Sequence, residues 1–408
     1  MKKFKYLVKS QLGQTVEGEI EALSESDASK ILISKKLIPI EIKPIDSFEI
    51  NLDSIPFLSF FSRVPARKKA IAIRQFATLI RSGLSITQAL SILEDQESHK
   101  KLKQIFDSVL KEVEGGGTLS NAFSQNMDVF TSIDIGLVKA GERSGTLDKV
   151  LDRMADQLEK QASLMSKIRG AFTYPAIVLV VAIGVISVMM VYLVPKLKDV
   201  YSGFKQDLPF VTQVMVSISN FMINYWWVLI LLIIAIISGF ISFKKTKFGR
   251  RLLDEFKLNM PVFKDFLRMV YMARFTRTLS TLISSGISIT ESLKITSDAI
   301  GNVIYEEEIA KLTESVRQGK SLSLSMIESE LFPKTVSQML KVGEETGEID
   351  SMLSNLANYY DEEVDNIVKT ISTLLEPLII VIMGLSVLFI LVGIMTPIYQ
   401  MGQFMFKR

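Results

Sequence analysis

Two acidic side chains in the middle of the sequence are the clearest candidates for ligand chemistry. Asp152 and Asp156 are four residues apart, which places both carboxylates on one face of a helix. Carboxylate oxygens suit a hard cation. A solvated acidic face accounts for the same two residues, so both interpretations stay open at this point.

Three glutamates lie at positions where a carboxylate affects stability or can bind a partner. We treat them as candidate contact residues. Glu142 and Glu344 each follow a glycine, and we expect them either to contact a basic partner or to favour the positive end of the following helix. Glu376 stands at the start of a long apolar segment, where a carboxylate costs free energy unless it stays at the interface or finds a partner. We hypothesise that Glu376 makes a polar contact with another subunit or protein.

Residues for most kinds of active site are missing. The chain has no cysteine, and its single histidine, His99, lies in a charged run that indicates a solvated surface. Gly319-Lys320-Ser321 lacks the glycine, five residues before Gly319, that a phosphate-binding loop requires. The net charge of +3 is too small to indicate nucleic acid. The sequence therefore predicts a protein that is not an enzyme and does not bind nucleic acid.

Three apolar segments are long enough to cross a membrane. About 20 apolar helical residues span a hydrocarbon core about 30 Å thick. Segments 171–195, 221–243 and 376–400 meet that length and are predicted to be transmembrane helices. Pro175 and Pro377 are expected to begin helices, since proline suits the first turn.

Flanking cations predict the orientation. Lysines and arginines precede the first segment and follow the second, which indicates that these sides are cytoplasmic. We therefore expect a cytoplasmic N-terminus and a periplasmic C-terminus. The expected order is a module with a linker at 1–65, cytoplasmic helical bundles at 66–170 and 244–375, a periplasmic segment at 196–220 and a periplasmic tail at 401–408.

The two halves of the chain repeat each other. Thr78–Thr87 returns as Thr281–Thr290, and Lys139–Gly145 returns as Lys341–Gly347. Each copy has helical apolar spacing interrupted by glycines. The glycines expected in turns between helices are Gly83, Gly141, Gly145, Gly286, Gly343 and Gly347.

The N-terminal module has a different pattern. Phe4, Tyr6 and Val8 alternate with polar residues, and Gly13 permits a turn before a second alternating run, which predicts a β-hairpin. A short helix and a further strand near Ile38 are expected to follow. The predicted fold class is therefore mainly α, with a small α+β N-terminal module, two duplicated cytoplasmic helical bundles and three transmembrane helices.

This combination of features resembles the type II secretion F protein family, which includes the type IV pilus platform proteins. The resemblance rests on the Gly-Glu-x-x-Gly runs at 141–145 and 343–347, the Ser-Gly turns at 82–83 and 285–286, and the layout of three spans. It covers nearly the whole chain, and residues 1–43 also resemble the N-terminal domain of the family.

The resemblance implies a role and partners. A member of this family is an inner-membrane protein that couples a cytoplasmic ATPase to the assembly of pilins or pseudopilins. Its expected partners are that ATPase, other inner-membrane machine components, membrane lipid and further copies of itself. Some members are thought to bind calcium through two acidic residues and a glutamine, which would be Asp152, Asp156 and Gln96 here; otherwise no cofactor is expected. A membrane transporter or channel with large cytoplasmic domains is the alternative, and a membrane-bound enzyme has no supporting motif.

Overall fold

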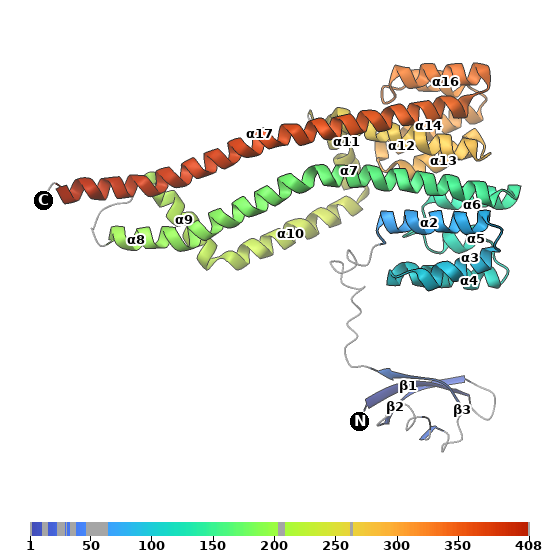
Figure 1. The fold of residues 1–408 in the computed structure, drawn as a ribbon, viewed down its shortest axis with the longest axis horizontal. Coiled ribbons are helices and arrows are strands. Elements are labelled where there is room, and N and C mark those ends of the chain that lie inside the picture. The colour runs from blue at the N-terminus through green and yellow to red at the C-terminus, as the bar shows by residue number, and fades with distance from the viewer. Residues whose placement is uncertain are drawn as a thin grey trace. The chain divides into compact units, whose positions relative to one another are not determined.

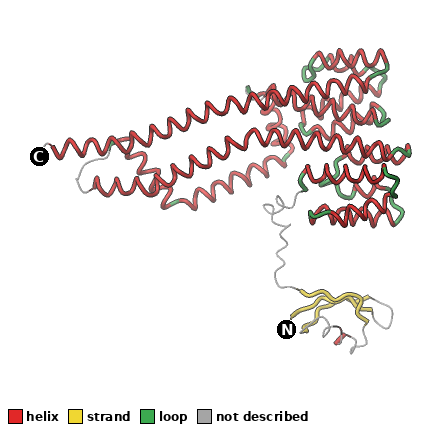
Figure 2. The backbone as a smooth tube through the Cα atoms, in the orientation of Figure 1, coloured by secondary structure: helices red, strands yellow, loops and turns green. Residues whose placement is uncertain are grey.

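The computed structural model describes residues 2–9, 15–22, 29, 31–32, 38–45, 64–202, 209–261 and 264–406. The chain divides into two compact units, Met1–Arg63 and Val64–Arg408, which are described separately below. Figure 1 labels the helices and strands, and Figure 2 shows that strands occur in the first unit while the described part of the second is helical.

The first unit contains an antiparallel sheet in the order β2-β1-β3. Its strands are β1 (Lys2–Lys9), β2 (Thr15–Ala22) and β3 (Ile38–Ile45). Residue 29 and residues 31–32 are helical, and Ala22 and Leu32 are buried. The predicted turn at Gly13 and the linker residues 46–63 lie outside the described residues.

Within the described residues, the first bundle of the second unit is built from five helices and the start of a long sixth one. They are α2 (Ala66–Arg81), α3 (Ile86–Gln96), α4 (Lys100–Glu114), α5 (Leu119–Ser124), α6 (Ser132–Ser144) and the start of α7 (Leu147–Val188). Ser85 and Thr131 begin α3 and α6 with capping boxes, which satisfy backbone N–H groups that have no partner within the helix. His99 caps α4, because its Nδ1 accepts a hydrogen bond from the Leu102 N–H at 3.4 Å.

The second bundle repeats this order after the membrane helices. Its helices are α11 (Lys247–Asn259), α12 (Lys264–Ser284), α13 (Ile289–Ile300), α14 (Val303–Arg317), α15 (Leu322–Ile327), α16 (Lys334–Thr346) and the start of α17 (Ile349–Phe406). Each bundle has its own apolar core, and each core also takes in side chains from the other copy. Leu282 and Ile287 pack into the first core, and Leu164 and Ile168 pack against the second.

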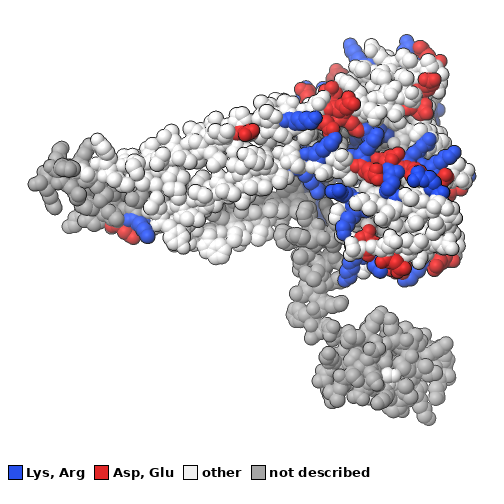
Figure 3. Space-filling view, viewed as in Figure 1, with Lys and Arg blue, Asp and Glu red and all other residues white. Residues whose placement is uncertain are grey.

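Two long helices join the bundles to the apolar part of the chain. Among the described residues, the helices long and apolar enough to cross a membrane are Leu147–Lys196, Trp226–Lys245 and Ile349–Thr396. Charged side chains gather over the bundles and are nearly missing along the apolar half of the visible face (Figure 3). Each bundle therefore runs into a span along one continuous helix.

The prediction that prolines begin the spans is wrong. Pro175 lies inside α7, and Pro377 lies inside α17. A proline within a helix removes one backbone hydrogen bond and costs about 3 kcal/mol or more in water, but helices in membranes tolerate it because nearby groups satisfy the freed carbonyl. The helix therefore continues through both prolines into the bundle.

The second span begins later than residue 221, where the sequence placed it. Helix α9 (Phe210–Asn224) ends one residue before α10 (Trp226–Lys245), and Tyr225 between them has φ −123° and ψ 22°. Met215 and Val216 of α9 are buried in a cluster with Ile390 and Ile394 of α17. Because α9 packs across other helices, the chain must turn at Tyr225 before α10 can begin.

Four of the six predicted turn glycines adopt the left-handed backbone conformation. The φ angles of Gly83, Gly145, Gly286 and Gly347 are 93°, 69°, 82° and 76°. An L side chain rarely adopts these angles, so glycine suits the ends of α2, α6, α12 and α16.

Gly141 and Gly343 are not turn residues, contrary to the prediction. They lie inside α6 and α16. A Cβ on Gly141 would lie 3.1 Å from the Val150 Cβ, and one on Gly343 would lie 3.0 Å from the Ile349 Cα. The reason for glycine at these positions is therefore the close approach of the following helix.

We expect Gly145→Ala and Gly170→Ala to change stability in opposite directions. A Cβ would meet nothing within 4 Å at either position, so neither substitution causes a clash. Gly145→Ala should lower the free energy of unfolding by about 1–2 kcal/mol, because its φ is positive. Gly170→Ala, within helix α7, should raise it by up to about 1 kcal/mol. Thermal unfolding of the purified chain in detergent measures both, and equal melting temperatures for the two variants would contradict the turn assignment.

Candidate functional site

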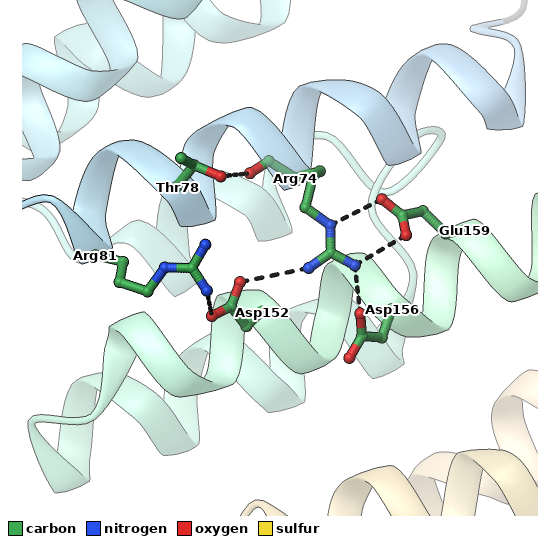
Figure 4. Close-up of polar contacts among 6 residues, drawn as sticks. All are labelled: Arg74, Thr78, Arg81, Asp152, Asp156 and Glu159. Atoms are coloured by element: carbon green, nitrogen blue, oxygen red, sulfur yellow. Dashed lines mark hydrogen bonds and ion pairs between the residues drawn. The ribbon is translucent and has the colours of Figure 1, made fainter.

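An arginine on α2 contacts three carboxylates on α7 (Figure 4). The Arg74 guanidinium donates to Glu159 through Nε at 2.8 Å and Nη2 at 2.9 Å, to Asp152 through Nη1 at 3.4 Å, and to Asp156. Arg81 donates to the other oxygen of Asp152 at 2.7 Å. The hydrogen bonds from Arg74 hold the pKa of Glu159 below its usual range, so this ion pair persists at neutral pH and weakens only as the pH falls through that lowered value.

The second copy repeats the central ion pair of this network. Arg277 on α12 matches Arg74, and it forms an ion pair with Asp361 on α17, which matches Glu159. The side chains of Thr78 and Thr281 donate to the backbone carbonyls of Arg74 and Arg277 at 2.8 and 2.9 Å. The duplicated arginine–carboxylate pair therefore ties α2 to α7 and α12 to α17, the two helices that enter the apolar region.

The acidic pair itself occurs only in the first copy. Ser354 and Asn358 of α17 stand where α7 has Asp152 and Asp156. Gln96 is the exposed last residue of α3, and among the described residues no hydrogen bond joins it to either aspartate. The structure thus places the two aspartates around arginine guanidinium groups. Gln96 is not hydrogen-bonded to either of them among the described residues. Calcium binding by Gln96, Asp152 and Asp156 stays a prediction.

Glu142 and Glu344 make the same hydrogen bonds in the two copies. These hydrogen bonds differ from the contacts expected from the sequence. The Glu142 carboxylate accepts from the Leu119 N–H at 2.6 Å and the Ser120 hydroxyl at 2.6 Å. The Glu344 carboxylate accepts from the Leu322 N–H at 2.7 Å and the Ser323 hydroxyl at 2.5 Å.

Each of these glutamates therefore caps the N-terminus of a short helix more than 20 residues before it, α5 or α15, rather than the helix that follows it. The sequence pointed to the next helix because Glu142 follows Gly141, which was expected to lie in the turn before that helix. The fold instead lays α6 beside the start of α5, where unpaired backbone N–H groups and the positive helix end attract a carboxylate.

A ladder of cations on α7 joins the first copy to the second. Arg153, Lys160 and Lys167 are seven residues apart, so they lie on one face of α7. Arg153 donates to the Ser284 carbonyl, Lys160 donates to the Asn358 Oδ1 at 3.5 Å, and Lys167 pairs with Asp365. The first contact reaches α12 and the other two reach α17. From the sequence, Lys160 and Lys167 were interpreted only as cations that flank a span. The seven-residue spacing of Arg153, Lys160 and Lys167 could have predicted that they share one helix face.

A cavity of about 400 Å³ lies beside this ladder, between the two copies. Its lining comes from α6, α7, α12, α13 and α17 and includes charged groups of both signs, among them Lys160, Arg274, Arg277, Asp298 and Asp361. The copies are therefore in contact through both apolar and polar groups around an incompletely filled space. An interface of this kind can shift more readily than a close-packed apolar core.

Helix α9 is tied to the apolar parts of both long helices. The Thr212 hydroxyl donates to the Gly393 carbonyl of α17 at 2.9 Å, and the Ser219 hydroxyl donates to the Met190 carbonyl at 2.6 Å. Met190 lies in the π-helical turn η2 (Met189–Leu193), which links α7 to α8 (Val194–Ser202). Such hydrogen bonds between helices are worth roughly 0.6–2 kcal/mol in a bilayer. This pair was not predicted from the sequence, although a seven-residue spacing of two hydroxyls in an apolar run indicates one helix face.

Glu376 lies within α17 with an exposed side chain, as does Tyr174 within α7. No hydrogen bond or ion pair of Glu376 occurs among the described residues. The structure thus leaves its carboxylate available on the outer surface of α17, and the predicted contact remains a hypothesis.

The duplicated bundle-and-span architecture matches a known family twice. Residues 72–195 and 275–397 each match the family described as type II secretion system protein F, and residues 1–43 match the N-terminal domain of that protein. The chain therefore belongs to the type II secretion system protein F family. The second match confirms the internal duplication.

Curated relatives carry the names of two kinds of machine. The chain is 37% identical to the type IV pilus assembly protein PilC of Thermus thermophilus over 400 residues, which cover 97% of each chain. It is 34% identical to PilC of Myxococcus xanthus over 98% of this chain and 95% of that one. It is 29% identical to type II secretion system protein F of Vibrio cholerae over 99% of this chain and all of that one.

We expect Glu142→Ala to lower stability far more than the exposed change Glu345→Ala in the second copy. Loss of the Glu142 carboxylate leaves the buried Leu119 N–H without a partner, at a cost of about 1–3 kcal/mol. Glu345 makes only an exposed contact at 3.9 Å with Lys341, so its removal should cost less than about 0.5 kcal/mol. Glu344→Ala should behave like Glu142→Ala, and the glutamine variants should keep part of the cap. Chemical denaturation in detergent measures the differences; a Glu142→Ala variant as stable as Glu345→Ala would show that the cap contributes nothing.

Proposed function

We propose that this chain is the inner-membrane platform protein of a type IV pilus or type II secretion machine, where it couples a cytoplasmic ATPase to the assembly of pilins or pseudopilins. The observation that carries the proposal is the continuity of α7 and α17, each of which belongs to a bundle at one end and to the apolar region at the other. Movement of one bundle against the other would be carried along these helices into the membrane. The names and full-length similarity of the relatives support the same role.

The proposed domain layout follows from this role. Residues 1–65 form an α+β module with its linker, and the bundles at 66–170 and 244–375 face the cytoplasm, where the ATPase and other machine components are reached. The short segments around α8 and α9 and the end of α17 face the periplasm. Energy comes from the ATPase rather than from this chain. Further copies of the chain and membrane lipid surround the three spans.

Breaking the ladder between the copies should abolish function and leave membrane insertion intact. We expect Lys167→Asp to abolish filament assembly or secretion while leaving protein level and membrane insertion unchanged, because it places two carboxylates together at Asp365. The double variant Lys167→Asp with Asp365→Lys should restore function. Lys111→Asp, which breaks an exposed pair with Asp107 inside α4, is the matched control and should have no effect. The readout is sheared surface pilin or secreted protein in a strain that lacks the natural copy.

Full assembly or secretion by the Lys167→Asp variant would contradict a role of the ladder in carrying movement between the copies. Normal piliation and secretion in a strain that lacks this chain altogether would contradict the platform role. A reporter fused after Phe243 should read cytoplasmic in the same strains, which checks that the charge change has not reversed the orientation.

Glu376 supplies a separate test of contacts within the machine. The exposed carboxylate on α17 motivates the hypothesis that Glu376 contacts another subunit or an incoming pilin. If that contact is ionic, Glu376→Gln and Glu376→Ala should both insert normally and lose assembly. If it is a hydrogen bond, the glutamine variant should retain most activity. Normal assembly by both variants would identify Glu376 as an interfacial carboxylate without a partner.

A further inference from the structure

Helix α11 begins directly after a membrane-spanning helix and is fixed to it by a tight corner. Helix α10 ends at Lys245 and α11 begins at Lys247, with Thr246 between them. The Thr246 hydroxyl donates to the Phe243 carbonyl at 2.7 Å and accepts from the Gly249 N–H at 3.0 Å. A Cβ on Gly249 would lie 2.1 Å from the Phe243 carbonyl oxygen, so this corner requires glycine. The start of α11 is therefore held at the end of the span.

One face of α11 is held against the second bundle. Asp254 is buried and accepts from the Val303 N–H at 3.1 Å, and Leu258 is buried in the core of that bundle. Arg250 and Arg251 pair with Glu306 and Glu307 of α14 at 2.8 and 3.0 Å. These contacts on α14 set the rotation of α11 about its axis, so the direction of its opposite face is also set.

The opposite face of α11 is apolar and exposed. Phe248, Leu252 and Phe256 follow one another at four-residue intervals, so they form one stripe. Their exposed fractions are 72%, 47% and 59%, high for large apolar side chains on a helix whose other face is packed. An exposed apolar stripe on a charged helix is typical of helices that lie in a membrane interface.

The surroundings of the stripe favour a lipid surface as its occupant. The stripe begins three residues after the last residue of a helix that, in the proposed function, crosses the bilayer. Lys244, Lys245 and Lys247 at the corner are all exposed, and cations at this position attract anionic headgroups. Figure 1 places α11 at the junction between the bundles and the apolar helices, where such headgroups would lie.

We propose that α11 is an interfacial helix that binds the anionic lipid surface on the side of the membrane that the bundles occupy. Phe248, Leu252 and Phe256 enter the boundary between headgroups and acyl chains, which interfacial helices reach to a depth of about 5–10 Å. The proposal rests on the membrane placement in the proposed function. It adds an attachment of the second bundle to the membrane besides the spans α10 and α17, in a segment outside the two family-matched ranges.

Single-cysteine labelling tests this placement, since the natural chain has no cysteine. Phe256→Cys carries the test label. Leu324→Cys on α15 is the matched control with the same exposed fraction of 59%, and Ile234→Cys on α10, at 61%, is the membrane control. Each variant of the full chain is labelled with an environment-sensitive fluorophore and placed, one chain per nanodisc, in phosphatidylcholine with or without phosphatidylglycerol. Doxyl-labelled lipid then reports contact with the bilayer, and iodide reports contact with water.

The expected result is severalfold stronger doxyl quenching at Phe256 than at Leu324, increasing with phosphatidylglycerol. Equal, weak doxyl quenching at Phe256 and Leu324 would overturn the proposal. Protection of Phe256 from iodide without doxyl quenching, seen only when a disc holds several chains, would assign the stripe to a second copy and would also overturn it. Weak doxyl quenching at Ile234 would instead contradict the membrane placement of α10, which separates failure of the proposed function from failure of this inference.

Discussion

A bilayer cannot supply hydrogen bonds to the backbone, and this constraint explains the two long helices on which the rest of the structure depends. A helix that enters the hydrocarbon must keep its own hydrogen bonds and needs only about 20 residues to cross. Helices α7 and α17 contain 42 and 58 residues, or roughly 63 and 87 Å at 1.5 Å per residue. About half of each helix therefore belongs to a bundle, and each bundle core forms around a helix that is also a span.

Duplication supplies two such units, and their polar contacts show which features the fold itself requires. The pairs Arg74–Glu159 and Arg277–Asp361 recur, as do the Glu142 and Glu344 caps, so these residues stabilise the bundle in either copy. Other features occur once. The ladder on α7 and the acidic pair Asp152 and Asp156 belong to the first copy alone, so they are the better candidates for a role in the machine rather than in the fold.

Local patterns in the sequence were sufficient to predict the elements. Apolar runs gave three membrane helices, and glycines at positive φ, such as Gly83 and Gly286, marked the ends of helices because few other residues adopt that conformation. Predictions failed where a residue's partner lies far along the chain. Nothing near Gly141 indicates that α7 approaches it closely, and nothing near Glu142 indicates that its carboxylate caps α5. Pro175 was assigned a helix start from a rule for soluble helices, whereas α7 continues through it. Tyr225 ends α9 because of packing against η2 and α17, which the local sequence does not encode.

The central claim is that α7 and α17 carry relative movement of the bundles into the membrane. Spin labels at Tyr192→Cys, in the turn η2 that follows α7, and at Tyr399→Cys, near the end of α17, can measure the effect by double electron–electron resonance in nanodiscs with the cognate ATPase. Both tyrosine side chains are exposed. The account predicts a distance distribution that differs between ATP and ADP. It also predicts that this difference is lost when a short cross-link joins the two bundles. The cross-link connects the amine of Lys160 to the carboxylate that Asn358→Asp introduces. Identical distributions with both nucleotides, under conditions where the ATPase is bound and active, would contradict the account.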